Sequence, residues 1–272
     1  MTDKYAVIGN PIAHSKSPQI HRMFAEQTGQ DISYEAIEAP LDGFTDKIKW
    51  LLKEDYKGCN VTVPFKFEAF KIAAELSQRA KSAQAVNTLK FNSEIILGDN
   101  TDGTGLVNDL TKNWYFDFSE KRILLVGAGG AAYGVAKPLL QTKCQKLSIS
   151  NRTIEKAEQL ALSLIREFNN VDVYDFPPDN RQFDLVINAT SSGLRDELPI
   201  LPINIFAPGA LAYDMLYGHE TPFMKFAQKH DAAIISDGLG MLVEQAAESF
   251  RIWRGRDVKL DTASVIAALR KP

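Results

Sequence analysis

Residues 122–134 read RILLVGAGGAAYG, an apolar strand followed by a glycine-rich turn that opens a helix. Gly127, Gly129 and Ala132 have the spacing G-x-G-x-x-A. Gly127 permits the tight turn, Gly129 lets the backbone approach a pyrophosphate, and Ala132 lets the helix pack close to the strand. The helix N-terminus presents free N–H groups to phosphate. A glycine-rich turn without a ligand is the alternative, but the flanking strand and helix favour dinucleotide binding.

Strands and helices alternate on both sides of this turn. After it we expect a helix over 153–168 and strands over 146–151, 171–176, 183–190, 210–217 and 232–238, with Pro- and Gly-rich loops over 175–180 and 206–210. Before it we expect strands over 5–9, 32–39 and 58–63, and helices over 17–29, over 43–55 and from residue 64. Two helical stretches, 241–255 and 261–271, end the sequence. This alternation predicts an α/β fold with a mainly parallel sheet.

The composition is that of an average globular protein. The 272 residues are 45% hydrophobic and 24% charged, which is enough for one or two domains. A net charge of −3 argues against nucleic-acid binding but leaves small anionic ligands open. Cys59 and Cys144 lie far apart, so free thiols in a reducing compartment are favoured over a disulfide. No stretch has the pattern of a signal peptide or membrane span, so we expect a cytoplasmic, soluble protein without a membrane partner.

The end of the second strand after the glycine-rich turn bears on cofactor choice. An NAD enzyme usually has Asp or Glu there for the ribose 2′-hydroxyl. This sequence has Asn151, Arg152 and Thr153, with Lys156 one helical turn on. A guanidinium can pair with a 2′-phosphate, which a carboxylate would repel. The sequence therefore predicts NADP rather than NAD; a solvated arginine at a helix start is the alternative.

Two segments of the N-terminal half carry candidate binding residues. Residues 60–66, NVTVPFK, form a strand that Pro64 ends, and Lys66 is either a solvated charge at a helix start or directed into a pocket. Ser15 and Ser17 follow the first strand; Ser17 alone reads as a helix N-cap, but two hydroxyls one residue apart can also hold a carboxylate. His14 and His21 have no metal-ligand spacing, so we expect no metal site.

The order of these segments resembles the shikimate dehydrogenases. The matching blocks run from residue 9 to about residue 247: GNPIAHSKSP, NVTVPFK, AVNTL, GDNTDGTG, GAGGA, SNRT, NATSSG, DMLY with TPF, and DGLGMLVEQA. Each block alone is weakly specific, whereas the ordered set is strongly specific. The resemblance implies a substrate domain of 1–101 with 239–272 and a Rossmann NADP-binding domain of 102–238, with the active site in the cleft between them. It also implies reversible reduction of 3-dehydroshikimate to shikimate by NADPH, in the biosynthesis of chorismate and aromatic amino acids, by a monomer or homodimer.

The resemblance also assigns the substrate residues. Lys66 is the acid/base and Asp102 its partner, and both lie just past expected strands, so they could converge. Lys66 could instead mainly bind and polarise the carbonyl. Ser15 and Ser17 would hold the carboxylate with Tyr217 nearby, and the ring hydroxyls would contact Thr62, Asn87 and Gln245. Without the resemblance, Thr62 reads as a solvent-facing strand residue and Gln245 as an exposed helix position.

The cofactor residues follow from the same resemblance. The phosphate-binding turn is Gly127, Ala128, Gly129, Gly130 and Ala131, and the adenosine end is bound by Asn151, Arg152, Thr153 and Lys156. Ala189, Thr190 and Ser191 lie at the nicotinamide half, Met215 and Gly238 line its pocket, and Met241 belongs to the cofactor site. Met215 could equally be core packing.

The sequence departs from the family pattern at two positions and leaves rival functions open. Tyr133 stands where many members have Arg, which puts more weight on Arg152 and Lys156, and Gln78 stands where some relatives have an acidic residue. The nearest rival is a paralogue that also oxidises quinate, often with NAD. A non-catalytic NADP-binding regulator and a folate-linked methylene dehydrogenase are further alternatives. The retained Lys66 and Asp102 argue against the regulator, and the serine pair fits the folate enzyme poorly.

Overall fold

The computed structural model describes residues 2–92, 95–175 and 181–271. The chain folds into two compact units: unit 1 comprises Met1–Asn108 and Leu242–Pro272, and unit 2 comprises Asp109–Met241. The domain limits expected from the sequence, with 102–238 as the inserted domain, stay a prediction. No helix among the described residues has the length and apolar character needed to cross a bilayer.

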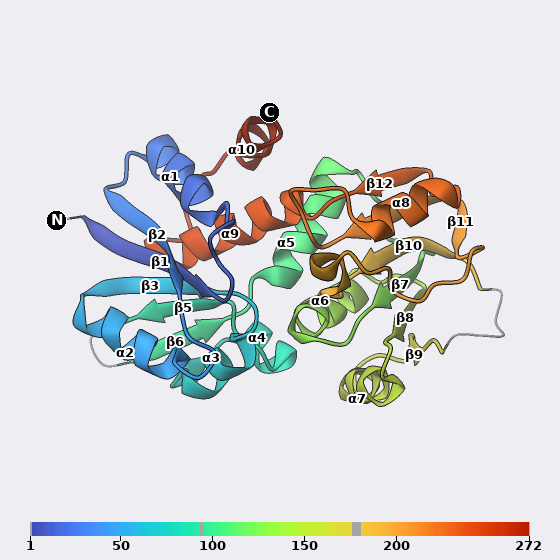
Figure 1. The fold of residues 1–272 in the computed structure, drawn as a ribbon, viewed down its shortest axis with the longest axis horizontal. Helices are drawn as coiled ribbons and strands as arrows, with labels where there is room; N and C mark the ends of the chain where they lie inside the picture. The colour runs from blue at the N-terminus through green and yellow to red at the C-terminus, as the bar shows by residue number, and fades with distance from the viewer. Residues whose placement is uncertain (1, 93–94, 176–180, 272) are drawn as a thin grey trace. The chain divides into compact units, whose positions relative to one another are not determined.

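Unit 1 is built on a mixed sheet with the strand order β2-β1-β3-β5-β6-β4 (Figure 1). Its elements are β1 (Asp3–Gly9), α1 (Ser17–Thr28), β2 (Ile32–Glu38), α2 (Phe44–Lys53), β3 (Tyr56–Val61), α3 (Lys66–Ile72), β4 (Glu75–Leu76), α4 (Gln78–Ala83), β5 (Thr88–Phe91), β6 (Ile96–Asp99), α5 (Asp102–Asn108), most of α9 (Leu239–Arg254), and α10 (Thr262–Leu269). Strand β1 pairs in parallel with β2 and β3, whereas β5 pairs antiparallel with β3 and β6.

The antiparallel β5 determines where the polar ends of unit 1 gather. A strand that runs antiparallel to its neighbours begins at the edge of the sheet where those neighbours have their carboxyl ends. The register pairs Asn60 near the end of β3 with Thr88 at the start of β5, and Thr88 with Asp99 at the end of β6. The segments that follow β1, β3 and β6, and the segment that precedes β5, therefore share one edge of the sheet.

The two faces of this sheet have different packing. Helices α2, α3 and α4 bury an apolar cluster that includes Ile8, Phe44, Leu51 and Phe65. The strand side chains that point to the opposite face pack against α1 and α9 in an aromatic cluster. There Tyr5 stacks on Trp253 with ring centroids 4.6 Å apart. Strands of this sheet therefore appear in the sequence as continuous apolar runs, because both faces of the sheet are buried.

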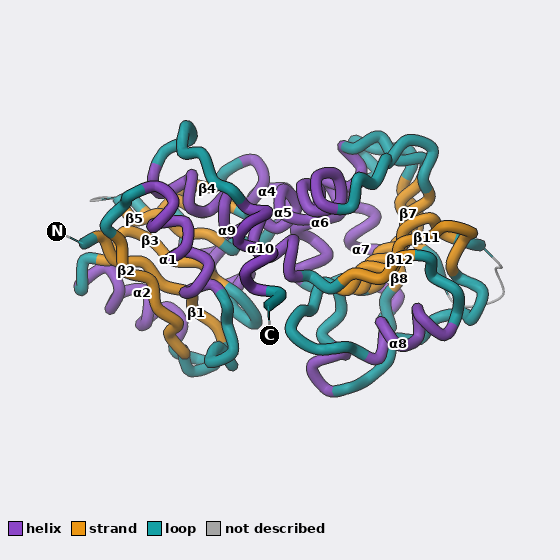
Figure 2. Tube along the Cα trace, turned by 90° about the horizontal axis from the view of Figure 1, so that it is seen from above, coloured by secondary structure: helices purple, strands orange, loops and turns teal. Residues whose placement is uncertain are grey.

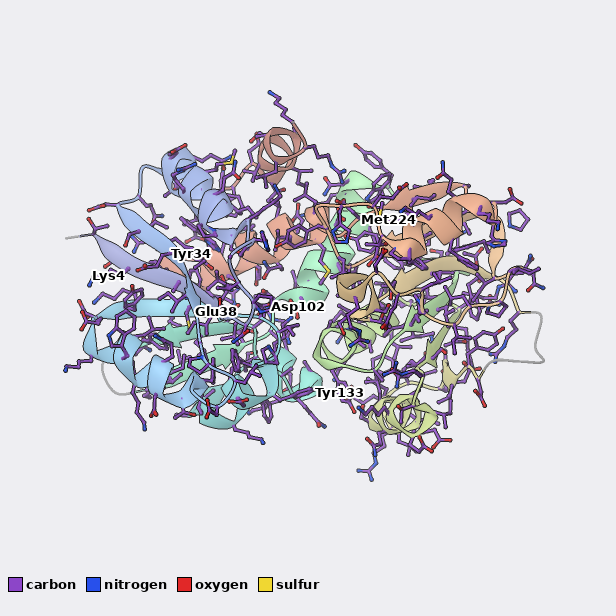
Figure 3. All side chains as sticks on the ribbon, viewed as in Figure 1. Lys4, Tyr34, Glu38, Asp102, Tyr133 and Met224 are labelled. Atoms are coloured by element: carbon purple, nitrogen blue, oxygen red, sulfur yellow. The ribbon has the colours of Figure 1, made fainter. Side chains whose placement is uncertain are left out.

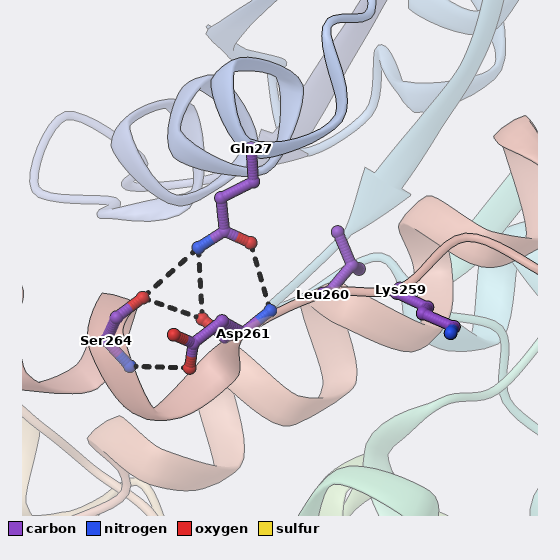
Figure 4. A pocket seen from close by; sticks show the side chains of 5 residues that line it. All are labelled: Gln27, Lys259, Leu260, Asp261 and Ser264. Atoms are coloured by element: carbon purple, nitrogen blue, oxygen red, sulfur yellow. Dashed lines mark hydrogen bonds between the residues drawn. The ribbon is translucent and has the colours of Figure 1, made fainter.

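The last helix is tied to the first one by polar contacts at a shallow pocket of about 500 Å³ (Figure 4). The side-chain amide of Gln27, near the end of α1, donates to the Asp261 carbonyl at 3.1 Å and accepts from the Asp261 N–H at 3.0 Å. Asp261 is the N-cap of α10 and accepts from the Ser264 N–H at 3.0 Å. These bonds attach the C-terminal segment to unit 1.

Unit 2 is a parallel sheet with the strand order β12-β11-β10-β7-β8-β9, which is the order of a Rossmann fold. Its strands lie side by side in Figure 2. The elements are a π-helical turn (Asp109–Asn113), β7 (Arg122–Val126), α6 (Gly130–Gln141), β8 (Lys146–Ser150), α7 (Ile154–Leu164), β9 (Val171–Val173), β10 (Phe183–Asn188), a 3₁₀ turn (Ser192–Arg195), β11 (Phe206–Asp214), α8 (Pro222–Lys229) and β12 (Ile234–Ser236). The predicted α/β fold class with mainly parallel sheets is confirmed.

The structure corrects several local predictions. The helix expected from residue 64 begins only at Lys66 and ends at Ile72, because Glu75 and Leu76 pair with β6 as the short strand β4. The loop expected over 206–210 belongs to β11, whose register with β10 jumps from Phe206 to Leu211, so Pro208 and Gly209 lie in an exposed irregularity. Ser17 is not an N-cap: it is the first residue of α1, and Ser15 Oγ accepts its N–H at 3.3 Å. Residues 176–180 of the expected strand and loop lie outside the described residues.

Candidate active site

Lys66 and Asp102 form a mostly buried ion pair in unit 1. Lys66 Nζ lies 2.6 Å from Asp102 Oδ2, and their side chains are 14% and 6% exposed. Lys66 is the first residue of α3, which starts after β3 has ended at Val61, two residues before the end that was predicted next to Pro64. Asp102 is in the first turn of α5, where the helix N-terminus favours a carboxylate. Lys66 is therefore not the solvated charge of the first alternative.

The Asp102 carboxylate, labelled in Figure 3, is held on its other side by a network of neutral amides. Asn87 Nδ2 donates to Asp102 Oδ1 at 2.7 Å, and Asn87 Oδ1 accepts from the Thr101 N–H at 2.9 Å. Gln245 of α9 places its Oε1 3.3 Å from Asn87 Nδ2, and its own Nε2 donates to the Leu242 carbonyl at 2.9 Å. Asn87 is 3% and Gln245 is 9% exposed, so the exposed position first read for Gln245 is wrong.

The segment before Asp102 is held by an ion-paired arginine. Asn100 Oδ1 accepts from the Asp102 N–H at 3.1 Å, and Asp99 Oδ1 accepts from the Asn100 N–H at 2.7 Å. Arg79 clamps Asp99 with two bonds, from Nε at 3.0 Å and Nη2 at 2.7 Å. Burial acts to raise the pKa of Asp99, but the bonds from Arg79 and Ser77 outweigh it and hold that pKa below its ordinary value.

The hydroxyl residues of unit 1 follow strands at the same sheet edge. Ser15 and Ser17 come after β1, and Ser17 is 5% exposed although no hydrogen bond of its side chain appears among the described residues. Thr62 directly follows β3, is half-buried, and its methyl group would collide with a Cβ at Gly9. It is thus not a solvent-facing strand residue. This edge places hydroxyls, an ammonium, a carboxylate and two amides in one region of unit 1.

The glycine-rich turn of unit 2 leaves space where a phosphate would be expected. Gly127 has φ of +115°, and a Cβ there would lie 3.1 Å from the Ala189 backbone. A Cβ at Gly129, by contrast, would meet nothing within 4 Å. The helix α6 begins at Gly130 with no acidic residue in its first turn, and Ala132 is fully buried against the sheet. The open backbone at the helix N-terminus fits the pyrophosphate of a dinucleotide. Ala128 and Ala131 belong to the same turn.

The end of β8 contacts this turn through Asn151. Asn151 Oδ1 accepts from the Ala128 N–H at 3.2 Å, and Asn151 Nδ2 donates to the Thr153 carbonyl at 2.8 Å. Thr153 is the N-cap of α7. Arg152 and Lys156 are exposed, and neither makes an ion pair within the described part of the chain. Two exposed cations next to the turn that Asn151 binds are well suited to pair with a 2′-phosphate.

The loops after β10 and β11 are joined by a buried Asn–Asp pair. Asn188 Oδ1 accepts from the Thr190 hydroxyl at 2.7 Å, and Asn188 Nδ2 donates to Asp214 Oδ2 at 3.1 Å. Asp214 also accepts from the Thr221 hydroxyl at 2.5 Å and the Leu216 N–H at 3.0 Å. Burial raises the pKa of Asp214 despite these bonds.

The remaining cofactor candidates lie in or beside these loops. Ala189 donates its N–H to the Val126 carbonyl at 2.8 Å, and Ser191 is exposed before the 3₁₀ turn. Gly238 donates to the Leu216 carbonyl at 2.8 Å, and a Cβ at Gly238 would overlap the Met215 backbone, so Met215 and Gly238 lie together. Met241 is 6% exposed, and Tyr217 is half-buried in unit 2. The roles of Met241 and Tyr217 stay predictions.

Comparison with known proteins gives a family for this arrangement. Residues 7–89 match the model of the shikimate dehydrogenase substrate binding domain, residues 109–195 that of shikimate / quinate 5-dehydrogenase, and residues 238–270 that of the shikimate 5'-dehydrogenase C-terminal domain. A shikimate dehydrogenase (NADP(+)) of Methylobacillus flagellatus is 55% identical over 98% of this chain and 99% of its own length. The chain belongs to the shikimate dehydrogenase family.

Two solved structures have the same fold along the whole chain. The crystal structure of an Ael1 enzyme from Pseudomonas putida is 41% identical, with a TM-score of 0.89 and coverage of 100% of this chain and 99% of that one. Shikimate 5-dehydrogenase of Thermus thermophilus, crystallised with NADP(H) and shikimate, is 30% identical with a TM-score of 0.86 over 99% of both chains. Both units of this shikimate dehydrogenase family member are covered by these similarities.

The sequence analysis missed the buried polar side chains that support the candidate residues. Asn60, Thr101, Asn188 and Asp214 are each at most 6% exposed and each hydrogen-bonds a residue of the candidate site or its loop. Each of them stands at or just after the end of a strand. For Asn60, Asn188 and Asp214, a polar residue next to apolar neighbours is a signal that could have been used, because buried polar groups need partners.

Proposed function

We propose that this chain reduces 3-dehydroshikimate to shikimate reversibly, by hydride transfer from NADPH, in the biosynthesis of chorismate and aromatic amino acids. The single observation that carries the proposal is the mostly buried contact of Lys66 Nζ with Asp102 Oδ2 at 2.6 Å, with Asn87 on the second carboxylate oxygen. Reduction of a ketone needs a hydride on carbon and a proton on oxygen. NADPH supplies the hydride when bound, and the ammonium of Lys66 is a donor for the oxygen.

In this proposal each residue of unit 1 binds or orients one part of the substrate. Lys66 gives a proton to the carbonyl oxygen in reduction and takes it back in oxidation, and Asp102 holds the ammonium in place and balances its charge. Asn87 and Gln245, already hydrogen-bonded to one another, contact the ring hydroxyls together with Thr62. Ser15 and Ser17 hold the carboxylate through their hydroxyl groups, with Tyr217 as a further contact. Neutral hydroxyls and amides suit a polyol because each can serve either end of a hydroxyl hydrogen bond.

In unit 2 the proposal assigns one end of NADP to each group of residues. The turn Gly127–Ala131 receives the pyrophosphate, and Arg152 with Lys156 receives the 2′-phosphate. The residues assigned to the nicotinamide end are Ala189, Thr190, Ser191, Met215, Gly238 and Met241. The support is the open space at Gly129 and the exposed, unpaired cations after β8.

The test is an absorbance assay at the NADPH band with shikimate and quinate, each paired with NADP and with NAD. We expect shikimate with NADP to give the highest kcat/KM. Quinate stays a second candidate substrate because the family model over residues 109–195 covers both activities. No shikimate-dependent absorbance change with either cofactor would contradict the proposed function and would favour a non-catalytic NADP-binding protein.

The role of Lys66 is tested by Lys66→Ala against Lys71→Ala. Lys71 is an exposed lysine of the same helix, so its loss removes an equal charge without touching Asp102. We expect Lys66→Ala to lower kcat by about 10²- to 10⁴-fold, the usual contribution of general acid–base catalysis, with a smaller change in the shikimate KM. A rise in KM alone would show that Lys66 binds or polarises and does not transfer the proton.

We further propose that the protein acts in the cytoplasm as a monomer or homodimer, without nucleic-acid or membrane partners. The net charge of −3 supports the absence of a nucleic-acid partner. Light scattering after gel filtration, with and without NADP, measures the oligomeric state. A larger assembly would contradict this part of the proposal.

A further inference from the structure

Asn60 is a buried amide that bridges four side chains or backbone groups in unit 1. It lies in β3 and is 6% exposed. Its Nδ2 lies 3.1 Å from the Asn87 carbonyl, 3.1 Å from Thr88 Oγ1 and 3.0 Å from Ser249 Oγ. Its Oδ1 accepts a hydrogen bond from the Tyr34 hydroxyl at 2.7 Å. The amide therefore has partners on both its donor and its acceptor side.

The donor side of Asn60 supports the residue that holds Asp102. The carbonyl next to Asn60 belongs to Asn87, whose own Nδ2 donates to Asp102 Oδ1 at 2.7 Å. The hydroxyl of Thr88, also next to Asn60, donates to Asn87 Oδ1 at 2.8 Å. Asn60 thus fixes the Asn87 backbone directly and its side chain through Thr88. The orientation of the Asn87 amide sets which way the Asp102 carboxylate turns toward Lys66.

The acceptor side of Asn60 leads to the helix that carries a candidate carboxylate-binding residue. Tyr34, labelled in Figure 3, lies in β2. Its ring stacks on His21 of α1, with ring centroids 4.2 Å apart and planes within 8°. His21 is fully buried and lies one helical turn after Ser17, the first residue of α1. The contacts therefore run from α1 through Tyr34 and Asn60 to the Asn87–Asp102 pair.

A packing role alone does not account for an amide at this position. Burying an amide costs free energy unless its hydrogen bonds are made, and an apolar residue of the same size would fill the volume without that cost. The four partners of Asn60 come from three separate segments, β2, residues 87–88 and α9. Residues held together in this way are supports of a site rather than fillers.

We propose that Asn60 is a positioning residue of the reaction, which holds Asn87 so that Asp102 stays turned toward Lys66 and which links that pair to the α1 helix. This inference rests on the proposed function. Loss of the amide should let the Asn87 backbone and the Asp102 carboxylate reorient, and proton transfer is sensitive to small displacements. Cofactor binding belongs to unit 2 and should not respond.

The test compares Asn60→Leu, Asn60→Ala, Tyr34→Phe and Tyr56→Phe by kcat and KM for shikimate and NADP, with the folded fraction measured by circular dichroism. Leu keeps the branched shape of Asn60 without leaving a cavity and removes its hydrogen bonds, so we expect kcat of Asn60→Leu to fall as far as that of Asn60→Ala, about 10- to 100-fold. Tyr34→Phe should lower kcat about fivefold, the effect of one lost hydrogen bond. The NADP KM should stay within about twofold in all variants.

Tyr56→Phe is the matched control because it removes an equivalent bond between the same two strands. Tyr56 lies in β3 and its hydroxyl donates to Glu35 of β2, outside the network around Asn87. We expect its kcat to stay unchanged. The inference is overturned if Asn60→Leu keeps the wild-type kcat, or if Tyr56→Phe lowers kcat as much as Tyr34→Phe does. If the Asn60 variants do not fold, the comparison of the two tyrosine variants decides. Wild-type protein without shikimate-dependent activity would instead refute the proposed function.

Discussion

Asn87 donates a hydrogen bond to the Asp102 oxygen that faces away from Lys66, at 2.7 Å, while Lys66 Nζ binds the other oxygen at 2.6 Å. The carboxylate is therefore held from both sides, by a neutral amide and by an ammonium. A carboxylate with two fixed oxygens cannot rotate away when substrate enters. The fixed carboxylate in turn holds the Lys66 ammonium in one orientation, so that it is ready to transfer a proton to a substrate that approaches from one direction.

Replacing Asn87 should disturb this pair without removing either charge. For Asn87→Ala we expect kcat/KM for shikimate to fall by about 10- to 100-fold, because a hydrogen bond to a buried charged group contributes about 1.5–3 kcal/mol. Asn92→Ala is the control, since Asn92 is exposed in the loop after β5. Steady-state kinetics of both variants give the answer, and equal activities would mean that Asn87 does not support Asp102.

Sequence reasoning reached the fold of unit 2 more completely than that of unit 1. The strands β7, β8 and β10 are short apolar runs bounded by glycine and polar residues, so their signal is local. In unit 1 the two-residue strand β4 exists only because β6 lies beside it, and residues 75–76 continue a helical pattern in the sequence. Tertiary pairing overrode local preference there.

The same limit applies to the candidate site. Local patterns placed Lys66, Asp102 and the glycine-rich turn at the ends of strands, and that position alone brings residues 36 apart into contact. The partners of Asn60 and Asn188 were not predictable, because each amide is satisfied by groups from other strands and helices. An isolated asparagine in a strand shows only that some partner must exist.

Arg152 should decide between the two dinucleotides. In Arg152→Asp a carboxylate replaces an exposed guanidinium after β8, so it should repel a 2′-phosphate and tolerate a 2′-hydroxyl. We expect the KM for NADP to rise about 10- to 100-fold while the KM for NAD stays equal or falls, as expected for loss of about 1.5–3 kcal/mol. Steady-state kinetics with both cofactors measure the ratio.

Arg166→Asp provides the charge-matched control for this change. Arg166 is an exposed arginine just after α7, whereas Arg152 lies just before that helix. The same change in net charge at Arg166 should leave the cofactor ratio as it is. An unchanged preference for NADP in Arg152→Asp would refute the assignment of Arg152 to the 2′-phosphate.

Arg79 should contribute more to stability than the exposed ion pairs do. Its guanidinium binds Asp99 and Glu248, whose side chains are 12% and 11% exposed. Arg79→Met leaves both carboxylates mostly buried without this partner, so we expect a loss of about 2–3 kcal/mol, below the full value for a buried pair because Arg79 itself is 31% exposed. Urea denaturation at pH 7 measures the change.

The control and the pH dependence separate this effect from a general loss of charge. Lys49→Met breaks an ion pair with Asp46 whose side chains are 71% and 84% exposed, and should cost at most about 0.5 kcal/mol. Burial acts to raise the pKa values of Asp99 and Glu248, but Arg79, together with Ser77 at Asp99 and Arg256 at Glu248, outweighs it and lowers both. Their stabilisation is present above the unfolded pKa values near 4 and is lost as the pH falls further, so Arg79→Met should lose less on acidification than wild type.

His21 should make the protein less stable below neutral pH. Burial lowers the pKa of His21 from 6.5 to about 3, although the neighbouring Asn60 acts to raise it, and neither ring nitrogen has a well-formed hydrogen bond among the described residues. Between these two values the unfolded chain binds a proton that the folded chain does not, so folding stability falls as the pH drops below about 6.5. The expected cost at pH 5.5 relative to pH 8 is about 1.4 kcal/mol from this residue.

His21→Phe removes the titrating group and keeps an aromatic ring next to Tyr34, Phe24 and Phe250. Urea denaturation followed by tryptophan fluorescence at pH 8 and pH 5.5 should show a smaller difference in the free energy of unfolding than in wild type. His14→Gln is the control because His14 is exposed in the loop after β1, and it should keep the wild-type difference. If His21→Phe kept it as well, His21 would not contribute to the pH dependence, and burial would not lower its pKa as described.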